Sequence, residues 1–157
     1  METNVKILIV RAIINTQQYF RPYAKFWYAP LVGFIVNTFS KEEIMDYFTL
    51  DLMVVLLSWH NVILPTDSNK LVINRLFENL MKRSYHTNRS ILKNNLELLK
   101  TMTECWTFLI EVPVEIIFNS FFKSTDQKKQ AAGIQLIGLV LTKLPEILII
   151  LILKKGW

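Results

Sequence analysis

Apolar residues recur at helical spacing along almost the whole 157-residue chain. From Val5 onward they fall three and four positions apart, which places their side chains on one face of an α-helix. The stripe that we expect to be buried comprises Val5, Leu8, Ile9, Ala12 and Ile13, and a second apolar face comprises Ile7, Val10 and Ile14. A helix that is apolar on two sides must be covered by more than one neighbour. We expect it to end near Tyr19, because Pro22 disfavours helical geometry at Arg21.

The same pattern continues through the next segments, which are punctuated by prolines and capping residues. Pro22 and Pro30 suit first-turn positions of a short helix and its successor. Ser40 and Glu43 have the spacing of a capping box, which opens a helix that ends near Trp59. The two apolar strips of this helix are Ile44, Phe48, Leu52, Val55 and Trp59, and Tyr47, Leu50, Val54 and Leu57.

Two cleaner amphipathic helices follow a loop at residues 61–68. Asp67 or Ser68 can cap the first of them. Its single apolar stripe is Ile73, Leu76, Phe77, Leu80 and Met81. After a polar loop at residues 82–88, Asn88 can cap the second helix. Its buried face is expected to comprise Leu92, Leu96, Leu99, Met102, Trp106 and Leu109.

The last helical segments follow an interruption at Pro113. We expect a short helix to about Phe121, and then a helix capped by Thr125 or Asp126. On the latter helix one apolar side comprises Ile134, Ile137, Leu141 and Leu144. Gly138 costs about 1 kcal/mol relative to alanine inside a helix, and close approach of a neighbouring helix would compensate. Since strand-like alternation is sustained nowhere in the sequence, we predict an all-α fold.

Repeat spacing refines this prediction to stacked helix pairs. Trp59 and Trp106 each close a long helix and lie 47 residues apart, within the roughly 40–47-residue period of HEAT-type repeats. We therefore predict a HEAT-like helical-repeat solenoid segment of antiparallel helix pairs over residues 1–144, followed by a divergent hydrophobic tail at 145–157. Such pairs cannot bury their apolar faces alone, which accounts for a hydrophobic content of 52%.

Several stretches of sequence carry a family resemblance. They are Arg11–Trp27 (RAIINTQQYFRPYAKFW), Leu57–His60 (LSWH), Asn74–Lys82 (NRLFENLMK), Asn95–Trp106 (NLELLKTMTECW) and Gly133–Val140 (GIQLIGLV). In this order they resemble the helical circular-cradle region, in its third part, of giant members of the phosphatidylinositol 3-kinase-related kinase family. Beyond Val140 the tail departs from the family pattern, and we expect a truncated or mis-spliced product or an incomplete gene model.

The resemblance implies a function for the chain. It implies a non-catalytic scaffold segment of a nuclear kinase that acts in DNA double-strand-break repair by non-homologous end joining. The implied partners are neighbouring helical repeats of the parent chain and, in the assembled kinase, the Ku heterodimer and DNA ends. Neither a cofactor nor a small-molecule substrate is expected.

Candidate chemistry within the sequence is sparse. A kinase needs a Gly-rich phosphate loop, a catalytic Asp loop and a metal-binding Asp-Phe-Gly, and the sequence contains none of them. The single cysteine, Cys105, excludes an internal disulfide and is expected to be a small buried residue. His60 and His86 lack partners at metal-ligand spacing, and His60 suits the end of a helix. Asp51 has no second carboxylate at usable spacing and is expected at a solvated edge or beside a cation.

Two groups of side chains are candidates for contact with partners. The loop cations are Lys82, Arg83, Arg89 and Lys93, with Tyr85 and His86 between them, in a chain of net charge +5. They could attract phosphates in a salt-dependent way, although a solvated turn is the interpretation that we favour. The second group, which Arg11, Arg21 and Lys25 bracket, is aromatic: Tyr19, Phe20, Tyr23, Phe26 and Trp27. For these rings we expect a packing wedge between successive helices rather than a ligand pocket.

Two alternative functions fit the sequence alone. A generic helical-repeat adaptor would bind a partner helix in a groove. A small membrane-associated protein would use the tail at residues 144–157. The longest uncharged runs, residues 26–40 and 52–66, are shorter than the roughly 18 residues that a spanning helix needs.

Overall fold

The computed structural model of the protein describes residues 3–38, 47–62 and 66–141. Within these ranges the structure contains helices and no strands, so the predicted all-α fold is confirmed. The α-helices are α1 (Thr3–Asn15), α2 (Gln17–Phe20), α3 (Ala24–Thr38), α4 (Tyr47–Ser58), α5 (Asp67–Lys82), α6 (Arg89–Cys105), α7 (Val114–Ile117) and α8 (Gln127–Leu141). Shorter turns are η1 (Arg21–Tyr23), η2 (His60–Val62) and η3 (Phe118–Phe122), of which η3 is π-helical.

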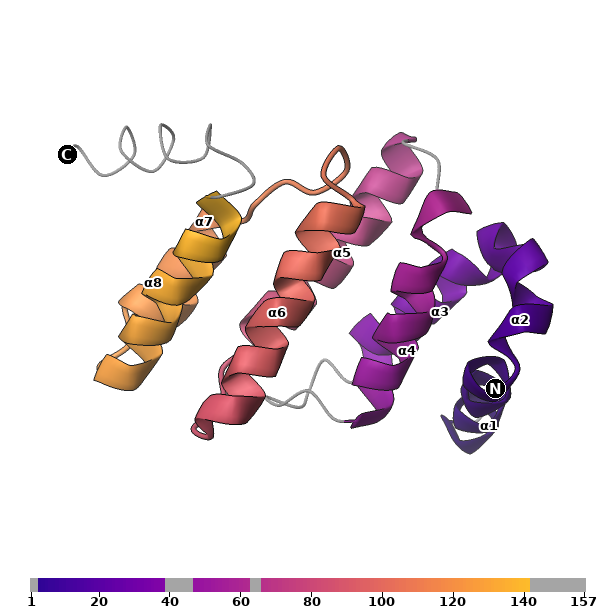
Figure 1. Cartoon of the computed structure of the whole chain (residues 1–157), viewed down its shortest axis with the longest axis horizontal. Coiled ribbons are helices and arrows are strands. Elements are labelled where there is room, and N and C mark those ends of the chain that lie inside the picture. Colours follow the sequence, from indigo (N-terminus) through magenta and orange to yellow (C-terminus); the bar gives the residue numbers. More distant parts are fainter. Residues whose placement is uncertain (1–2, 39–46, 63–65, 142–157) are drawn as a thin grey trace.

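The helices form two layers, as Figure 1 shows. One layer holds α3, α5 and α7, and α5 packs between the other two. The second layer holds α1, α4, α6 and α8, in which α1 contacts α4 and α6 contacts α8. Across the layers, α5 packs on α6 and α7 packs on α8. This arrangement confirms the prediction of stacked helix pairs, in which each pair contacts its neighbours along one axis.

The centre of the core agrees with the predicted stripes. The five apolar residues predicted for α5 are all completely buried. On α6, Leu96, Leu99 and Met102 are buried, and Trp106 lies at the C-cap with 2% of its surface exposed. Its ring meets Tyr28 of α3 edge to face, with 5.9 Å between the ring centroids. Trp106 therefore connects the end of α6, in one layer, to α3 in the other layer.

The first helix differs from its prediction. Val10 and Ile13 are its buried residues, whereas Val5, Leu8 and Ala12, which we expected in the buried stripe, are exposed. The helix contacts α4 and α2, so a neighbour covers the face around Val10, and its opposite face is left open. The predicted single helix also ends early, at Asn15, and resumes as α2 and η1.

The two prolines of this region behave differently. Pro22 occupies the first turn of η1, as predicted. Pro30 lies inside α3 instead of starting a helix, which corrects the prediction. A proline inside a helix costs about 3 kcal/mol, because its ring clashes with the preceding turn and it cannot donate a backbone hydrogen bond. Burial of the neighbouring Leu31, Val32 and Ile35 offsets that cost and keeps α3 continuous.

At α4 three of the five residues of the predicted first strip are confirmed as buried, and the second strip is only partly right. Leu52, Val55 and Trp59 are buried, whereas Val54 of the second strip is 60% exposed. The packing also buries Met53 and Leu56, which the two-strip pattern leaves out. The predicted capping box, Ser40 and Glu43, and the strip residue Ile44 lie outside the described residues.

On α8 the predicted apolar side is wrong. Ala132, Gly133 and Leu136 are buried, and Ile134 is 63% exposed. The cause is a close approach to η3: a Cβ atom at Gly133 would lie 2.7 Å from Cβ of Phe121. The close approach that we predicted at Gly138 therefore occurs at Gly133, five residues earlier. The predicted residues 141 and 144 lie outside the side chains that the structure describes.

The helix caps largely follow the sequence. Asn88 caps α6, where its Oδ1 accepts a hydrogen bond from Ser90 N at 2.9 Å. Asp126 precedes α8, and its Oδ1 accepts from Lys128 N at 2.9 Å. For α5 the cap is Thr66, whose Oγ1 accepts from Asn69 N, rather than Asp67 or Ser68. The error is one residue, within the usual uncertainty of helix ends.

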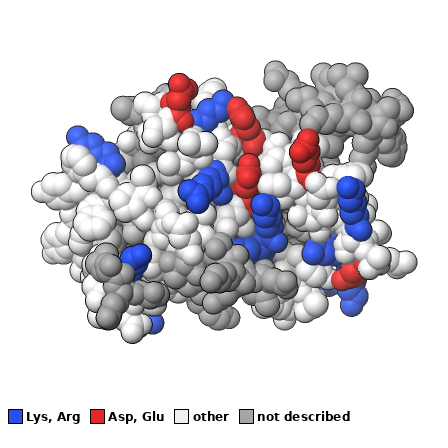
Figure 2. All heavy atoms as spheres, turned by 180° about the vertical axis from the view of Figure 1, so that it is seen from behind, with Lys and Arg blue, Asp and Glu red and all other residues white. Residues whose placement is uncertain are grey.

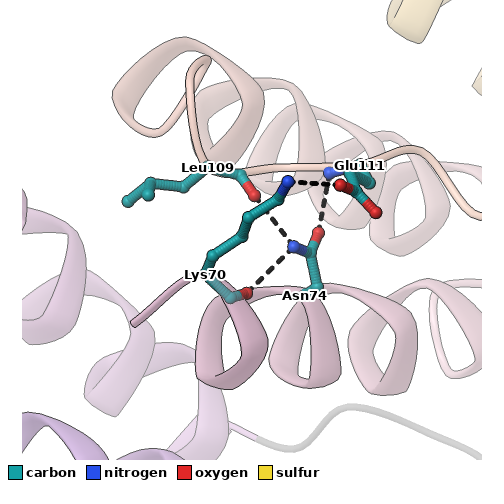
Figure 3. Close-up of polar contacts among 4 residues, drawn as sticks. All are labelled: Lys70, Asn74, Leu109 and Glu111. Atoms are coloured by element: carbon teal, nitrogen blue, oxygen red, sulfur yellow. Dashed lines mark hydrogen bonds and ion pairs between the residues drawn. The ribbon is translucent and has the colours of Figure 1, made fainter. Parts of the chain in front are cut away.

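A polar clamp fixes α5 to the segment that leads from α6 to α7 (Figure 3). The Asn74 amide donates to the carbonyl of Leu109 at 2.8 Å, and its Oδ1 accepts from Glu111 N at 2.7 Å. One turn earlier on α5, the Lys70 ammonium pairs with the Glu111 carboxylate. Because one side chain satisfies two backbone groups of an irregular segment, the clamp fixes the connection between consecutive helix pairs.

Candidate functional site

The loop at residues 83–88 is held firmly against α6. The Asn95 amide donates to the carbonyl of Ser84 at 2.9 Å, and both side chains are buried. Arg83 is also buried, with 4% of its surface exposed, and its Nη1 donates to Oδ1 of Asn79 at 3.4 Å. The guanidinium of Arg83 therefore turns inward. It is not offered to a partner as the sequence interpretation supposed.

The other three predicted cations, Lys82, Arg89 and Lys93, are exposed. Arg89 and Lys93 line a groove of about 770 Å³ between α6 and α8, helices that lie side by side in Figure 1. Lys128 and His86 line the same groove. The fold thus brings a cation of α8 to the two cations of α6, and it leaves Lys82 outside the groove lining.

The groove is polar at its loop end and apolar along its floor. Leu92 and Leu96 of α6 and Ala132 and Leu139 of α8 form the floor. At the loop end, Nδ1 of His86 accepts a hydrogen bond from Asn88 N at 2.9 Å. An accepting Nδ1 leaves the ring proton on Nε2, so His86 presents an N–H donor on its other side.

The aromatic ring of Tyr85 ties this loop to the start of α8. Its hydroxyl donates to Oδ2 of Asp126 at 2.9 Å, and the Lys129 ammonium lies 5.6 Å from its ring centroid. The hydrogen bond raises the pKa of Tyr85 and, together with the backbone N–H of Lys128, lowers the pKa of Asp126. Asp126 therefore stays ionised at the N-terminus of α8, where its charge also complements the helix dipole.

Other candidate side chains have structural environments. The His60 ring donates from Nδ1 to the carbonyl of Leu57 at 2.7 Å, after the end of α4 as predicted. Cys105 is half-buried rather than fully buried, and desolvation followed by the Glu104 charge raises the pKa of its thiol. Asp51 is exposed. Across the described ranges, His, Cys, Asp and Glu side chains form no cluster that could hold a metal ion.

The aromatic set near the first turn is only partly the wedge that we predicted. Phe20 and Trp27 are half-buried and meet edge to face at 5.6 Å. Tyr19, Tyr23 and Phe26 are 71%, 58% and 65% exposed, so these three rings do not form part of a packed wedge. Among the described helices none is both long and apolar enough to cross a bilayer.

Sequence reasoning located two of the groove cations and missed the groove itself. Lys128 lies 35 residues after Lys93, and only the packing of α6 on α8 brings them to one groove. The available signal was weak: Lys128 and Lys129 follow the capping Asp126 in the first turn of a helix. Nothing in that pattern indicates which face of α8 meets α6.

Comparison with family models divides the chain into two matched parts. Residues 1–65 match the CC3 model of the DNA-dependent protein kinase catalytic subunit. Residues 74–147 match its CC5 model. The predicted third cradle part therefore corresponds to the first match only, and the second match lies in a different cradle unit. The predicted boundary at residue 144 remains a prediction.

Individual relatives give the same result over one continuous alignment. The chain is 38% identical over 141 residues to the DNA-dependent protein kinase catalytic subunit of Gallus gallus and 37% over 142 residues to that of Xenopus laevis. The Dictyostelium discoideum protein is 31% identical over 143 residues. Each alignment covers 88% of this chain and about 3% of the relative. With two cradle models and these relatives in agreement, the chain belongs to the family of the DNA-dependent protein kinase catalytic subunit.

Proposed function

We propose that the chain is a non-catalytic scaffold segment of a DNA-dependent protein kinase catalytic subunit-like protein, acting in the nucleus in double-strand-break repair by non-homologous end joining. The observation that carries the proposal is the similarity to such kinases over 88% of the chain, together with the matches of residues 1–65 and 74–147 to their cradle models. The proposed partners are neighbouring helical repeats and, in the assembled kinase, the Ku heterodimer and DNA ends.

The mechanism that we propose is mechanical rather than chemical. Stacked helix pairs transmit shape from one repeat to the next, since each pair contacts only its neighbours. Two features fix the geometry here: the Asn74 clamp between α5 and the segment after α6, and the close contact of Gly133 with Phe121. Both are short-range contacts: the Asn74 clamp holds α5 to the segment that follows α6, and the contact of Gly133 with Phe121 holds α8 against η3 within the last pair.

A chimeric kinase tests this proposal. In the full-length Gallus gallus catalytic subunit, the aligned stretch is replaced by residues 1–140 of this chain. We expect the chimera to assemble with Ku on DNA ends and to retain DNA-stimulated kinase activity, because the stretch supplies shape and no reacting group. The readouts are phosphorylation of a peptide substrate with and without DNA ends, and end joining in cells that lack the kinase.

The matched control is the same chimera carrying Gly133→Leu, which disturbs the packing of α8 on η3. This variant should lose Ku-dependent assembly on DNA ends. Its kinase activity in the absence of DNA ends should stay at the basal level of the unsubstituted chimera. A wild-type chimera that accumulates to normal levels but fails to assemble on DNA ends would refute the scaffold function. It would favour a helical-repeat adaptor with other partners.

A further inference from the structure

We propose that the groove between α6 and α8 binds an acidic peptide segment that carries aliphatic side chains. The proposal concerns the groove in the 157-residue chain, and it stands independently of the scaffold function. The bound segment would place its carboxylates at the loop end of the groove and its aliphatic side chains along the floor. Two properties of the groove support this choice of partner: the cations on its walls and the apolar side chains of its floor.

The charge of the groove selects an anionic partner. Arg89 and Lys93 from α6 and Lys128 from α8 bring three exposed cations to its walls, and His86 adds a donor. Among the described residues that line the groove, Glu97 supplies the one carboxylate, and the Lys100 ammonium lies 3.8 Å from it. Because cations project from two walls, they can contact carboxylates spaced along one bound segment.

The floor of the groove selects a partner with apolar side chains. Leu92, Leu96 and Leu139 are half-buried or better, and each borders the groove. Gly138 opens the floor further, since a Cβ atom there would meet no atom of the described structure within 4 Å. Removing aliphatic side chains from water against such a floor favours binding by about 25 cal/mol per Å². A phosphate group alone would leave this surface unused.

Duplex DNA fits these features less well than a peptide. A groove of about 770 Å³ has the size of a site for a few side chains, whereas duplex binding needs cations spread along a wide surface. On the described part of the opposite face, Figure 2 shows basic and acidic side chains interspersed rather than a wide run of cations. Concave shape, apolar floor and clustered cations together favour the peptide.

Fluorescence anisotropy of a labelled peptide with alternating Glu and Leu residues tests the proposal on the full chain, with the wild type and the variants at one low chain concentration and at matched molar mass by light scattering. The triple variant Arg89→Gln, Lys93→Gln, Lys128→Gln should bind at least about tenfold more weakly, since three rim charges are lost. The control triple variant Lys6→Gln, Arg21→Gln, Lys25→Gln removes the same charge from exposed positions on α1, η1 and α3. It should bind as the wild type does.

A second variant tests the floor without changing the charge. Gly138→Leu places a side chain in the open space of the groove and should weaken peptide binding about tenfold while circular dichroism stays helical. Equal peptide affinity in the wild type and the Arg89, Lys93, Lys128 variant would overturn the proposal. So would binding of labelled duplex DNA, but not of the peptide, that depends on the same three cations. That outcome would make the groove a nucleic-acid surface.

Discussion

Replacing Trp106 with alanine is expected to lower the free energy of unfolding by about 3–5 kcal/mol, the cost of truncating a large buried aromatic. The ring is 2% exposed, caps α6 and meets Tyr28 edge to face with an interplanar angle of 82°. Its indole N–H has no hydrogen-bond partner among the described residues, so the loss is one of packing. Urea unfolding followed by circular dichroism measures it, with both proteins at the same low chain concentration because association adds to the apparent stability.

Phe108→Ala is the matched control, because it removes an aromatic ring two residues away that is 94% exposed. We expect that variant to change the free energy of unfolding by less than about 0.5 kcal/mol. If both variants unfolded at the wild-type urea midpoint, the stripe from Leu96 to Trp106 would not be packed, and the core as described here would be wrong.

Replacing Gly133 with leucine is expected to lower the free energy of unfolding by roughly 3 kcal/mol, at the upper end for overpacking. Even the first added atom would lie 2.7 Å from Cβ of Phe121, which is closer than van der Waals contact allows. Neither the α8 backbone nor η3 can shift without losing the packing of Leu136 and Phe121, both fully buried. Thermal unfolding gives the same comparison as urea.

Gly138→Leu is the same chemical change one and a half turns later on the same helix. Because nothing in the described structure lies within 4 Å of the new Cβ, leucine should stabilise α8 by up to about 1 kcal/mol through its better helix propensity. We therefore predict that Gly133→Leu lowers the free energy of unfolding and that Gly138→Leu raises it. If Gly138→Leu alone lowered the free energy of unfolding, the close approach would lie at Gly138, as the sequence predicted. If both variants lowered it equally, Gly133 would not be the specific point of close packing.

The sequence predicted burial well where a helix has one apolar face. On α5 the single stripe from Ile73 to Met81 leaves one way to bury it, and all five residues are buried. On α1 and α8 apolar residues occur on two faces, and periodicity alone does not say which face meets a neighbour. The buried faces there are set by tertiary contact, of α1 with α4 and of α8 with η3.

The candidate site was predictable to a similar extent. The charge pattern after α5 indicated Arg89 and Lys93, and both line the groove. It could not distinguish Arg83, whose guanidinium is directed inward toward Asn79, from its exposed neighbours. Lys128 was missed because its proximity depends on two helices that are distant in sequence. The local sequence pattern therefore indicated which residues carry charge, whereas the groove depends on the packing of α6 against α8.

We expect this solenoid segment to pack its exposed apolar surfaces against further repeats. Val5 and Leu8 on the open face of α1 are 42% and 66% exposed, and a patch of this kind drives association. The aliphatic run at residues 147–153 adds β-prone sequence. The most direct test is the molar mass of the purified full chain by light scattering after size exclusion, with helicity checked by circular dichroism. We predict a mostly helical chain that elutes as oligomers or aggregate, whereas a sharp helical monomer peak near 18.5 kDa would contradict the assignment as a solenoid segment with exposed docking surfaces.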